Sequence, residues 1–283
     1  MTIPLESSDE KLLLHIKSWV ELNLMKCQCN LNSENEITKI LLESKYMDIN
    51  DQTYTNLYQP HEIDTNGTLL NKAVDDNNIK MINLIINHPD FDKDKSDLYK
   101  AIFDNLKKNK DVPIFELLMK LADIDVINKH KINRKGILSY MTDDKFEINN
   151  ISDSNNDNDI LSKLFNTPGL VFEKDDINDA FENIFTNFLD PFNRTHYFGI
   201  SHLRKLVDYD RKNNNYIDLN RISFEGRSYF TSIKKETIES NIFDFLLEIG
   251  ADPNIPDGYG IYPLQYEFYS DFNQYILQLI NSN

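Results

Sequence analysis

Residues 241–264 read N-I-F-D-F-L-L-E-I-G-A-D-P-N-I-P-D-G-Y-G-I-Y-P-L, and this stretch decides the expected fold. Phe243, Leu246 and Leu247 fall at positions i, i+3 and i+4, so they share one face of a helix. Asn241 stands where a side chain can cap the start of that helix. The spacing therefore predicts a helix whose apolar face another element must cover.

A glycine and two prolines then set the path of the chain. We expect Gly250 to end the helix, because the residue just past a helix often takes the left-handed conformation that glycine tolerates. Pro253 cannot continue a helix, so residues 251–254 are expected to leave in extended form. Residues 257–260 (D-G-Y-G) predict a tight turn. Pro263 suits the first turn of a following helix, where the missing N–H costs nothing.

This order of helix, glycine, extended segment, turn and proline-led helix resembles the junction between two ankyrin repeats, which the family writes roughly as L-L-x-x-G-A-D-x-N-x-x-D-x-x-G-x-T-P-L. The matching positions are Leu246, Leu247, Gly250, Ala251, Asp252, Asn254, Asp257, Gly260, Pro263 and Leu264. Tyr262 replaces the threonine of the family. The resemblance implies an all-α, ankyrin-like solenoid of about six to seven helix-turn-helix repeats with degenerate capping repeats.

A second segment carries a weaker form of the same pattern. Thr68, Leu70 and Ala73 match the family's G-x-T-P-L-H-x-A, and an outer helix is expected over 79–87. Elsewhere helix spacing alone supports the resemblance. The other expected helices cover 9–24, 33–44, 97–106, 112–121, 136–141, 160–165, 177–189, 199–209, 227–237, 241–249, 262–270 and 272–280. Segments 47–50, 123–126 and 216–220 stand where the family places its extended fingers.

We expect a single solenoid over residues 1–283. Its parts are a degenerate N-terminal capping repeat with its connection over 1–62, repeats over 63–135, irregular repeats with long loops over 136–222, and repeats with a C-terminal cap over 223–283. Residues 142–159 are rich in Asp and Asn and are expected to form a long acidic loop. Terminal units face water on one side, so departures from the repeat pattern are expected there.

Composition limits the classes of partner. The 283 residues carry a formal charge of −16, which disfavours nucleic acid and anionic membranes. Lys107-Lys108-Asn109-Lys110 (107–110) is the densest basic block identified, and it is interpreted as a solvated helix end. With two cysteines there is no disulfide framework. Since the sequence shows no signal peptide and no membrane span, we expect the protein in the cytoplasm. We also expect it to be a monomer.

Two short patterns resemble metal sites without completing them. Cys27 and Cys29 supply half of a zinc site, and the simpler interpretation is a helix end with ordinary thiols. Residues 153–159 resemble the front of a calcium loop, but Leu164 stands where the loop needs a bidentate glutamate. A solvated loop is the simpler interpretation there. We therefore expect no metal and no cofactor.

The leading functional hypothesis is a non-catalytic module that binds a partner protein along a concave groove, which the resemblance implies. Tyr259 and Ile261 stand at a finger tip, and exposed aromatic residues often anchor interfaces; the alternative is that Tyr259 packs on the end of the stack. The other residues expected near the groove are Asn66, Asp75, Asp76, Arg227, Lys234 and Lys235. The acidic field favours a partner with a basic segment.

Two further classes stay open. An enzyme would have its site in the irregular region 142–220, with His196, His202 and acidic residues converging on a polar pocket. A structural spacer would lack exposed aromatic or charged clusters. A degenerate ankyrin-like protein of Asn-, Ile- and Lys-rich composition also resembles the effectors that intracellular bacteria or viruses place in the cytosol of host cells.

Overall fold

The computed structural model describes residues 49–50, 67–143, 159–189, 198–223, 226–233 and 241–265. These residues are mostly helical and contain no strand beyond one isolated bridge, so the all-α prediction is confirmed for them. None of their helices combines the length and apolarity needed to cross a membrane. The chain divides into two compact units, residues 1–127 and 128–283.

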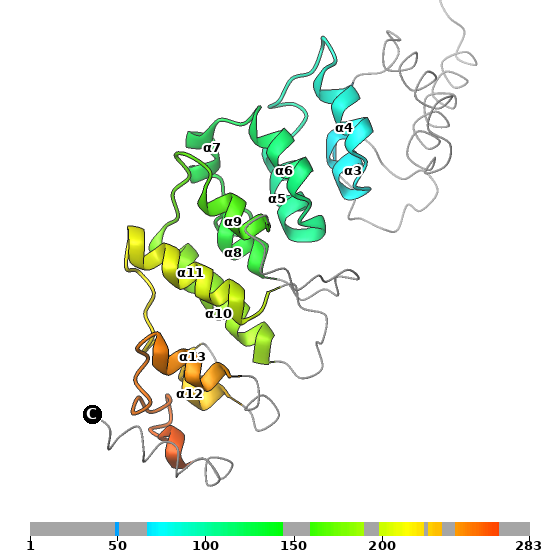
Figure 1. The fold of residues 1–283 in the computed structure, drawn as a ribbon. Coiled ribbons are helices and arrows are strands. Elements are labelled where there is room, and N and C mark those ends of the chain that lie inside the picture. Colours follow the sequence, from blue (N-terminus) through cyan, green and yellow to red (C-terminus); the bar gives the residue numbers. More distant parts are fainter. Residues whose placement is uncertain are drawn as a thin grey trace, which may run out of the picture. The chain divides into compact units, whose positions relative to one another are not determined.

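In the first unit, helices pack in pairs (Figure 1). The helices are α3 (Leu69–Asp75), α4 (Ile79–Ile86), α5 (Leu98–Asp104), the π-helix η1 (Asn105–Asn109) and α6 (Val112–Met119). Helix α3 packs against α4 and α5, and α5 packs against α6. The Thr68 hydroxyl accepts from Asn71 N–H at 3.3 Å and caps α3. The fully buried Leu70 and Ala73 face the neighbouring helices, as the repeat pattern predicts.

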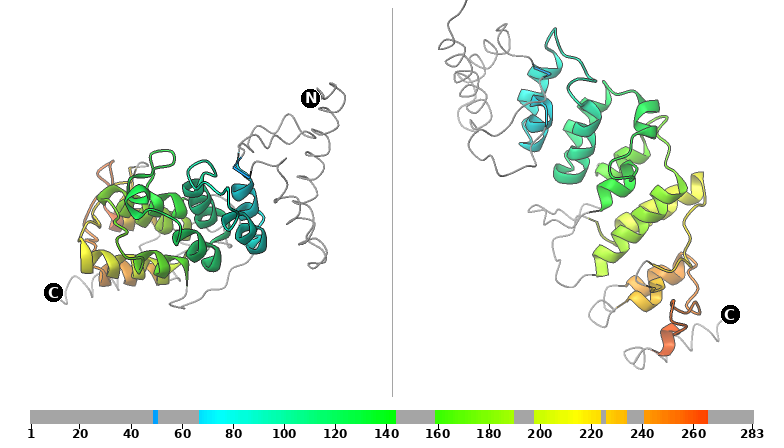
Figure 2. Two further views of the ribbon diagram at one scale, coloured as in Figure 1. Left: turned by 90° about the horizontal axis from the view of Figure 1, so that it is seen from above. Right: turned by 180° about the vertical axis from the view of Figure 1, so that it is seen from behind.

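The second unit also packs its helices in pairs, and among the described helices only α10 and α11 are longer than those of the first unit (Figures 1 and 2). Its helices are α8 (Ile137–Thr142), α9 (Ile160–Phe165), α10 (Lys174–Leu189), α11 (Ile200–Asn213), α12 (Tyr229–Ser232) and α13 (Ile242–Glu248), with a 3-10 turn η3 (Pro263–Gln265). Helix α10 packs against α8 and runs antiparallel beside α11, and α11 packs against α9. Buried aromatic rings fill the layer between α10 and α12: Tyr229 lies edge-on to Phe181 and Phe185, with ring centroids 5.1 and 4.9 Å apart.

Asparagine side chains tie segments between helices to their neighbours in one recurring geometry. Asn50 donates to Asp90 O at 2.8 Å and accepts from Asp92 N–H at 3.0 Å. Asn128 bonds the carbonyl of residue 169 and the N–H of residue 171 in the same way, at 3.0 Å each. Asn178 does so with residues 216 and 218, at 2.9 Å each. Each amide therefore satisfies one carbonyl and the N–H two residues later, as a neighbouring strand would.

A buried carboxyl holds the start of α8. Asp176 of α10 accepts from the N–H groups of Leu138 at 3.2 Å and Ser139 at 2.8 Å. The residue before the helix is Gly136, and a Cβ built there would lie 2.6 Å from Asp176 Cγ. Burial raises the pKa of Asp176, against the hydrogen bonds from Ser139 and Leu138 that lower it. Asp176 thus caps a helix that its own sequence does not cap.

Several sequence expectations are wrong in detail. Residues 123–126 were expected to be an extended finger, but α7 (Ile124–Lys129) is a helix, begun where Asp123 Oδ1 accepts from Asp125 N–H at 2.9 Å. Asn241 precedes α13 in the left-handed conformation (φ 59°) and its side chain makes no capping bond. Of the helix expected over 227–237, the described part is α12 (Tyr229–Ser232), which begins later because Ser228 caps it and which ends before the extended Ile233. Residues 234–237 lie outside the described residues.

Other expectations lie outside the described residues. They concern the first helix pair over 9–24 and 33–44, the finger residues 47–48, the pair Cys27 and Cys29, most of the acidic loop, and helix 272–280.

Candidate partner-binding surface

Helix α13 ends at the glycine that the sequence predicts, and the segment that follows leads to the candidate surface. Gly250 has φ 84°, its N–H donates to Leu247 O at 2.9 Å, and Ala251 N–H donates to Leu246 O at 2.9 Å. This is the Schellman arrangement, which closes a helix on a left-handed glycine. The extended form expected over 251–254 is not kept, because the chain turns at 252–255, where Asn254 N–H donates to Asp252 Oδ1 at 2.8 Å and Ile255 N–H donates to Asp252 O at 3.4 Å. Asp252 N–H donates to the Asn220 side chain at 3.3 Å.

Two arginines of α11 fasten α13 in place. Arg204 donates to both carboxylate oxygens of Glu248, at 2.5 and 2.7 Å, and its guanidinium carbon lies 5.4 Å from the Phe245 ring centroid. Arg211 donates to Ile249 O at 2.7 Å at the end of α13. The hydrogen bond from Arg204 lowers the pKa of Glu248. A bidentate pair fixes orientation as well as distance, so the segment after α13 starts from a defined direction.

The turn at 257–261 is closed from within by one buried side chain. Asp257 is only 4% exposed, and its Oδ1 accepts from the N–H groups of Tyr259 and Ile261 at 2.9 Å each. Its own N–H donates to Ile261 O at 2.9 Å, and Gly260 N–H donates to Asp257 O at 2.9 Å. The carboxylate thus satisfies two backbone donors that the tight turn leaves unpaired. Such a turn is rigid, so whatever it displays is held in place before a partner arrives.

A second turn lies against the first. Gly258 N–H donates to Gly226 O at 2.6 Å, and Ser223 N–H donates to Arg227 O at 2.8 Å across the base of the second turn. Gly226 has φ 77°, and a Cβ there would lie 3.4 Å from the Tyr259 ring. The ring therefore rests across the backbone of Gly226. Glycine is needed at this position for its conformation, since a Cβ there would meet the ring only at an ordinary van der Waals distance.

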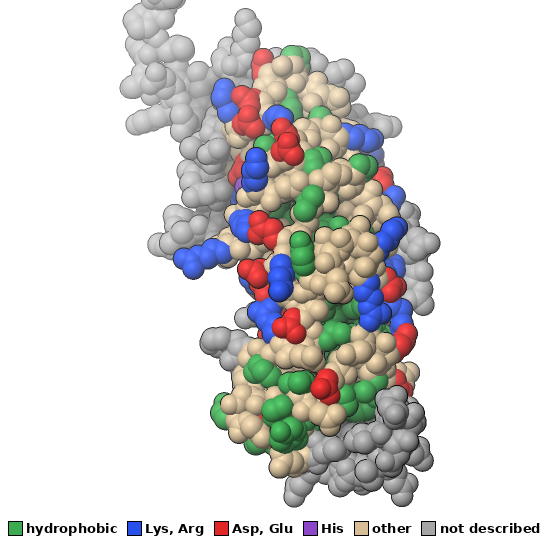
Figure 3. Space-filling model, turned by 90° about the vertical axis from the view of Figure 1, so that its left-hand side faces the viewer, with side chains coloured by type: hydrophobic (Ala, Val, Ile, Leu, Met, Phe, Trp, Pro, Cys, Tyr) green, Lys and Arg blue, Asp and Glu red, His purple; other side chains and the backbone are tan. Residues whose placement is uncertain are grey.

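The paired turns carry apolar side chains that water reaches. Tyr259 is 78% exposed, Tyr262 is 49% exposed, and Ile261 and Ile222 are 39% and 37% exposed. We call these four residues, together with Arg227, the finger-tip surface. Hydrophobic side chains gather at the lower end of the view in Figure 3, beside residues that are not described. Exposure of this kind on a rigid turn is typical of an interaction site.

The structure brings some of the expected residues together. Tyr259, Ile261 and Arg227 lie on the two paired turns, and Arg227 is exposed. Lys234, Lys235 and Asn66 lie outside the described residues.

Asp75 and Asp76 belong to the first unit, where each faces a lysine. Asp75 pairs with Lys108 at 2.8 Å, and Asp76 pairs with Lys72 at 2.8 Å. Exposed pairs of this kind hold their charges with little net stabilisation. Both carboxylates are ion-paired with a lysine of their own unit, so neither is an unpaired charge.

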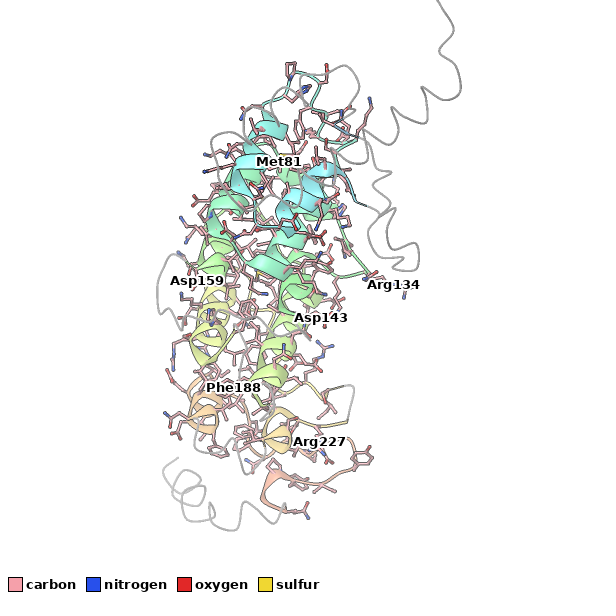
Figure 4. All side chains as sticks on the ribbon, turned by 90° about the vertical axis from the view of Figure 1, so that its right-hand side faces the viewer. Met81, Arg134, Asp143, Asp159, Phe188 and Arg227 are labelled. Atoms are coloured by element: carbon pink, nitrogen blue, oxygen red, sulfur yellow. The ribbon has the colours of Figure 1, made fainter. Side chains whose placement is uncertain are left out.

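In the described part of the irregular region, a buried polar cluster lies around Asp159. Its Oδ1 caps α9 by accepting from Ser162 N–H at 2.7 Å, and its Oδ2 pairs with Lys205 of α11. Lys205 also donates to Ser162 Oγ at 3.1 Å, and His202 Nε2 lies 4.0 Å from Asp159 Oδ2. Figure 4 shows Asp159 where α9 begins.

This cluster joins the helices α9 and α11 from inside. Asp159 and His202 are each 3% exposed, so a substrate has no direct approach to them. His202 Nδ1 already accepts from Gly199 N–H at 3.1 Å at the start of α11. His196 lies outside the described residues, and the described ones contain no group of three or more potential metal ligands. The contacts made by these side chains are those of a structural network.

Sequence reasoning missed a basic segment, residues 129–135 (K-H-K-I-N-R-K). It holds four Lys and Arg side chains in seven residues, as many as any stretch of this acidic chain displays. A search for uninterrupted runs of Lys and Arg does not find this segment, because Ile132 and Asn133 interrupt it. The signal that finds it is charge counted in a window of seven residues, joined to the turn tendency of asparagine.

We compared the chain with protein-family models, with curated proteins and with solved structures, and none of the three comparisons gives a match. The resemblance to ankyrin repeats therefore stays a prediction that rests on the residues quoted above. What supports a function is the geometry of the chain itself, above all the rigid paired turns and the aromatic ring that they display.

Proposed function

We propose that the chain is a non-catalytic interaction module that binds a partner protein through the finger-tip surface. The observation that carries the proposal is Tyr259, which is 78% exposed on a turn closed by the buried Asp257. An exposed tyrosine ring leaves apolar area in contact with water, and this area adds no stability to the folded chain. On binding, that area is buried with little further loss of conformational freedom, which is how aromatic anchors come to dominate interfaces.

An ankyrin-like solenoid is the proposed scaffold. Three described features support it: helices in successive pairs, first helix packed on first helix (α3 on α5, α8 on α10), and segments between helices linked by asparagine amides. Such arrays present their turns and first helices along one face. The concave groove of the resemblance is part of this proposal, with the finger-tip surface at one of its edges.

The partner's chemistry is proposed from charge. The chain carries −16 overall, and the segment 241–265 contains four acidic residues and no Lys, Arg or His. A partner with a basic segment beside an apolar or aromatic anchor would meet both the acidic field and the exposed rings. We further propose that the chain acts as a monomer in the cytosol, as an effector in a host cell. This placement rests on the resemblance and on composition.

An enzyme with its site in 142–220 is the weaker proposal. It needs His202 and an acidic residue to face a substrate, whereas His202 and Asp159 face each other inside the α9–α11 contact. Lys205 is ion-paired to Asp159 and donates to Ser162 Oγ at 3.1 Å, so it bridges α9 and α11. The polar cluster therefore supports packing of the helices better than it supports catalysis.

The experiment is affinity capture with matched baits. Purified chain is immobilised beside two variants, Tyr259→Ala with Lys234→Ala and Lys235→Ala, and Val171→Ala as the control. Val171 is also exposed (62%), but it lies in the segment before α10 and outside the finger-tip surface. The expected result is a protein retained by wild type and by the control and lost from the triple variant. Loss of a tyrosine anchor is worth about 2 kcal/mol, or roughly 30-fold in affinity.

Two outcomes would contradict the proposal. Equal retention by all three baits would place the contact elsewhere on the chain. Absence of any retained protein across lysates would remove the support for an interaction module, and the irregular region would then be the place to search for chemistry. Crosslinking from a photoreactive residue at position 259, compared with position 171, distinguishes direct contact at the finger tip from an indirect loss.

A further inference from the structure

The loop before α8 forms a tight two-residue hairpin turn. Ile132 N–H donates to Lys135 O at 3.1 Å, and Lys135 N–H donates to Ile132 O at 2.9 Å. Between them Asn133 and Arg134 have φ of 52° and 68°. Positive φ at both central positions defines a type I′ turn, whose second position is usually glycine because a side chain is strained there. Arg134 stands in the position that glycine would occupy without strain.

Cations surround this arginine in the segment 129–135, which we call the basic turn. Lys131 on one side pairs with Glu173 at 2.6 Å, and Lys135 on the other pairs with Asp143 at 2.6 Å. The hydrogen bond to Glu173 raises the pKa of Lys131. Both legs of the turn are therefore fastened to the body of the second unit by ion pairs.

Arg134 and Lys129 are left over from this pairing. Both side chains are exposed, and neither side chain makes a hydrogen bond or an ion pair with any residue in the described parts of the chain. Figure 4 places Arg134 at the outer end of its loop, away from the helices. A guanidinium with five donors and no acceptor, held outward by a strained turn, has no role in the packing of the unit. Strain of this kind is typical of residues that act on something outside the fold.

We propose that the basic turn is a second interaction site, which binds an acidic segment of a protein through its carboxylates. Arg134 is the main contact, because the guanidinium fork matches a carboxylate in two parallel hydrogen bonds. Lys129 adds a second positive charge within the same seven residues. This site lies outside the finger-tip surface and does not depend on it.

The small number of unpaired cations favours a peptide over a polyanion. Nucleic acid and anionic membranes present dense, extended negative charge, which a chain of net charge −16 repels as a whole. A short acidic segment needs to meet only the local positive field, within about one Debye length of roughly 8 Å at physiological salt. Two free cations match a few carboxylates and cannot neutralise a phosphate backbone.

The test measures binding of defined probe peptides to the full chain. The probe is a fluorescein-labelled decapeptide of alternating Glu and Ser, with a Gln-Ser decapeptide and a Lys-Ser decapeptide as charge controls. Fluorescence anisotropy is recorded at low salt and again at 0.15 M and at roughly 1 M, where screening shortens the Debye length to about 3 Å. We expect binding of the Glu-Ser peptide only, weakened by salt. Binding of the Lys-Ser peptide alone would overturn the proposal.

Variants locate the site. Arg134→Gly removes the guanidinium and also removes the strain, so we expect a weaker complex, by about fivefold, with a chain at least as stable in urea. Lys212→Gln removes one exposed charge from α11 and should leave binding unchanged. Tyr259→Ala should also leave it unchanged, which separates failure of this site from failure of the finger-tip surface. Equal loss in Arg134→Gly and Lys212→Gln would show general charge attraction and overturn the assignment.

Two further outcomes bear on the proposal. A fall in the urea midpoint of Arg134→Gly would show that Arg134 supports the fold, against the inference that it serves a partner. Tighter binding of a single-stranded RNA oligonucleotide of equal charge, or of phosphatidylserine vesicles, would make the ligand a phosphate polyanion and refute the acidic peptide. Amide chemical-shift changes confined to residues 129–135 upon titration with the Glu-Ser peptide would support it.

Discussion

Replacement of Gly136 by alanine tests the buried cap of α8. Gly136 has φ −72° and ψ −179°, which alanine adopts without strain, so the backbone itself favours the change by about 0.4–1 kcal/mol through the unfolded state. The added Cβ, however, would lie 2.6–2.7 Å from the three carboxyl atoms of Asp176. Asp176 cannot retreat without losing its bonds from Leu138 and Ser139 at 3.2 and 2.8 Å.

The expected loss follows from those two bonds. Hydrogen bonds to a carboxyl contribute about 1–3 kcal/mol each, and alanine is also a poorer residue than glycine before a helix by up to about 1 kcal/mol. After the gain in the unfolded state is subtracted, Gly136→Ala should lower the free energy of unfolding by about 2–4 kcal/mol. Urea unfolding followed by circular dichroism at 222 nm measures it.

Gly199→Ala is the matched control. Gly199 also precedes a helix, α11, in an extended conformation, but a Cβ there meets nothing within 4 Å. Its capping and unfolded-state effects should cancel to within about 1 kcal/mol. If Gly136→Ala and Gly199→Ala unfold within about 0.5 kcal/mol of each other, the crowding by Asp176 has no energetic weight and the reasoning fails. The double variant with Asp176→Ala should cost less than the sum of the two single variants, because each change removes the same two hydrogen bonds.

Three further predictions concern single buried groups. The Tyr229 hydroxyl is buried without a hydrogen-bond partner among the described residues, and Tyr229→Phe removes it while keeping the ring against Phe181. In urea melts the free energy of unfolding should stay unchanged or rise by about 1 kcal/mol, and a loss of more than that would reveal a partner. Asp257→Ala should destabilise by about 2 kcal/mol and speed hydrogen exchange at the Tyr259 amide, and unchanged exchange would show that the carboxylate does not close the turn. Burial raises the pKa of Asp176 above its ordinary value of 3.8. The stability of wild type relative to Asp176→Asn should therefore be greatest below that pH and fall as pH rises through the folded-state pKa. Urea melts between pH 3.5 and 7 that show the opposite trend would contradict this prediction.

Helices were predictable where periodicity and punctuation agree. The outer helix expected over 79–87 is α4 (Ile79–Ile86), and the helix over 160–165 has the same bounds in the structure. Gly250 takes the left-handed conformation that its place after α13 predicts. In these cases the determining forces are local, since an apolar face and a glycine act within a few residues.

Where tertiary contacts decide, sequence pattern failed. Asn241 is a good capping residue by type, yet it lies in a left-handed turn and leaves α13 uncapped by a side chain. Helix α8 has no polar capping residue of its own, and its cap, Asp176, comes from 38 residues further along the chain. No local rule reaches across such a distance.

In the candidate site too, the features that local sequence determines were predictable and those that tertiary contacts determine were not. Tyr259 was predicted as exposed from its place in a turn, and the structure confirms the exposure. The contact of the Tyr259 ring with Gly226 depends on a second turn more than 30 residues earlier, which the spacing of residues within one repeat does not specify. The basic turn was missed for a simpler reason, because Arg134 occupies a position where the usual turn signal is glycine.

The asparagines that bridge segments between helices bear on the behaviour of the protein at high concentration. Extended backbone with free N–H and C=O groups is a template on which another chain can add a strand, and such addition begins aggregation. Asn50, Asn128 and Asn178 each occupy one donor and one acceptor in the backbone of a segment between helices. Among the described residues, the amides thus occupy positions that an intruding strand would need, and protection against aggregation comes from side chains in a fold without a sheet.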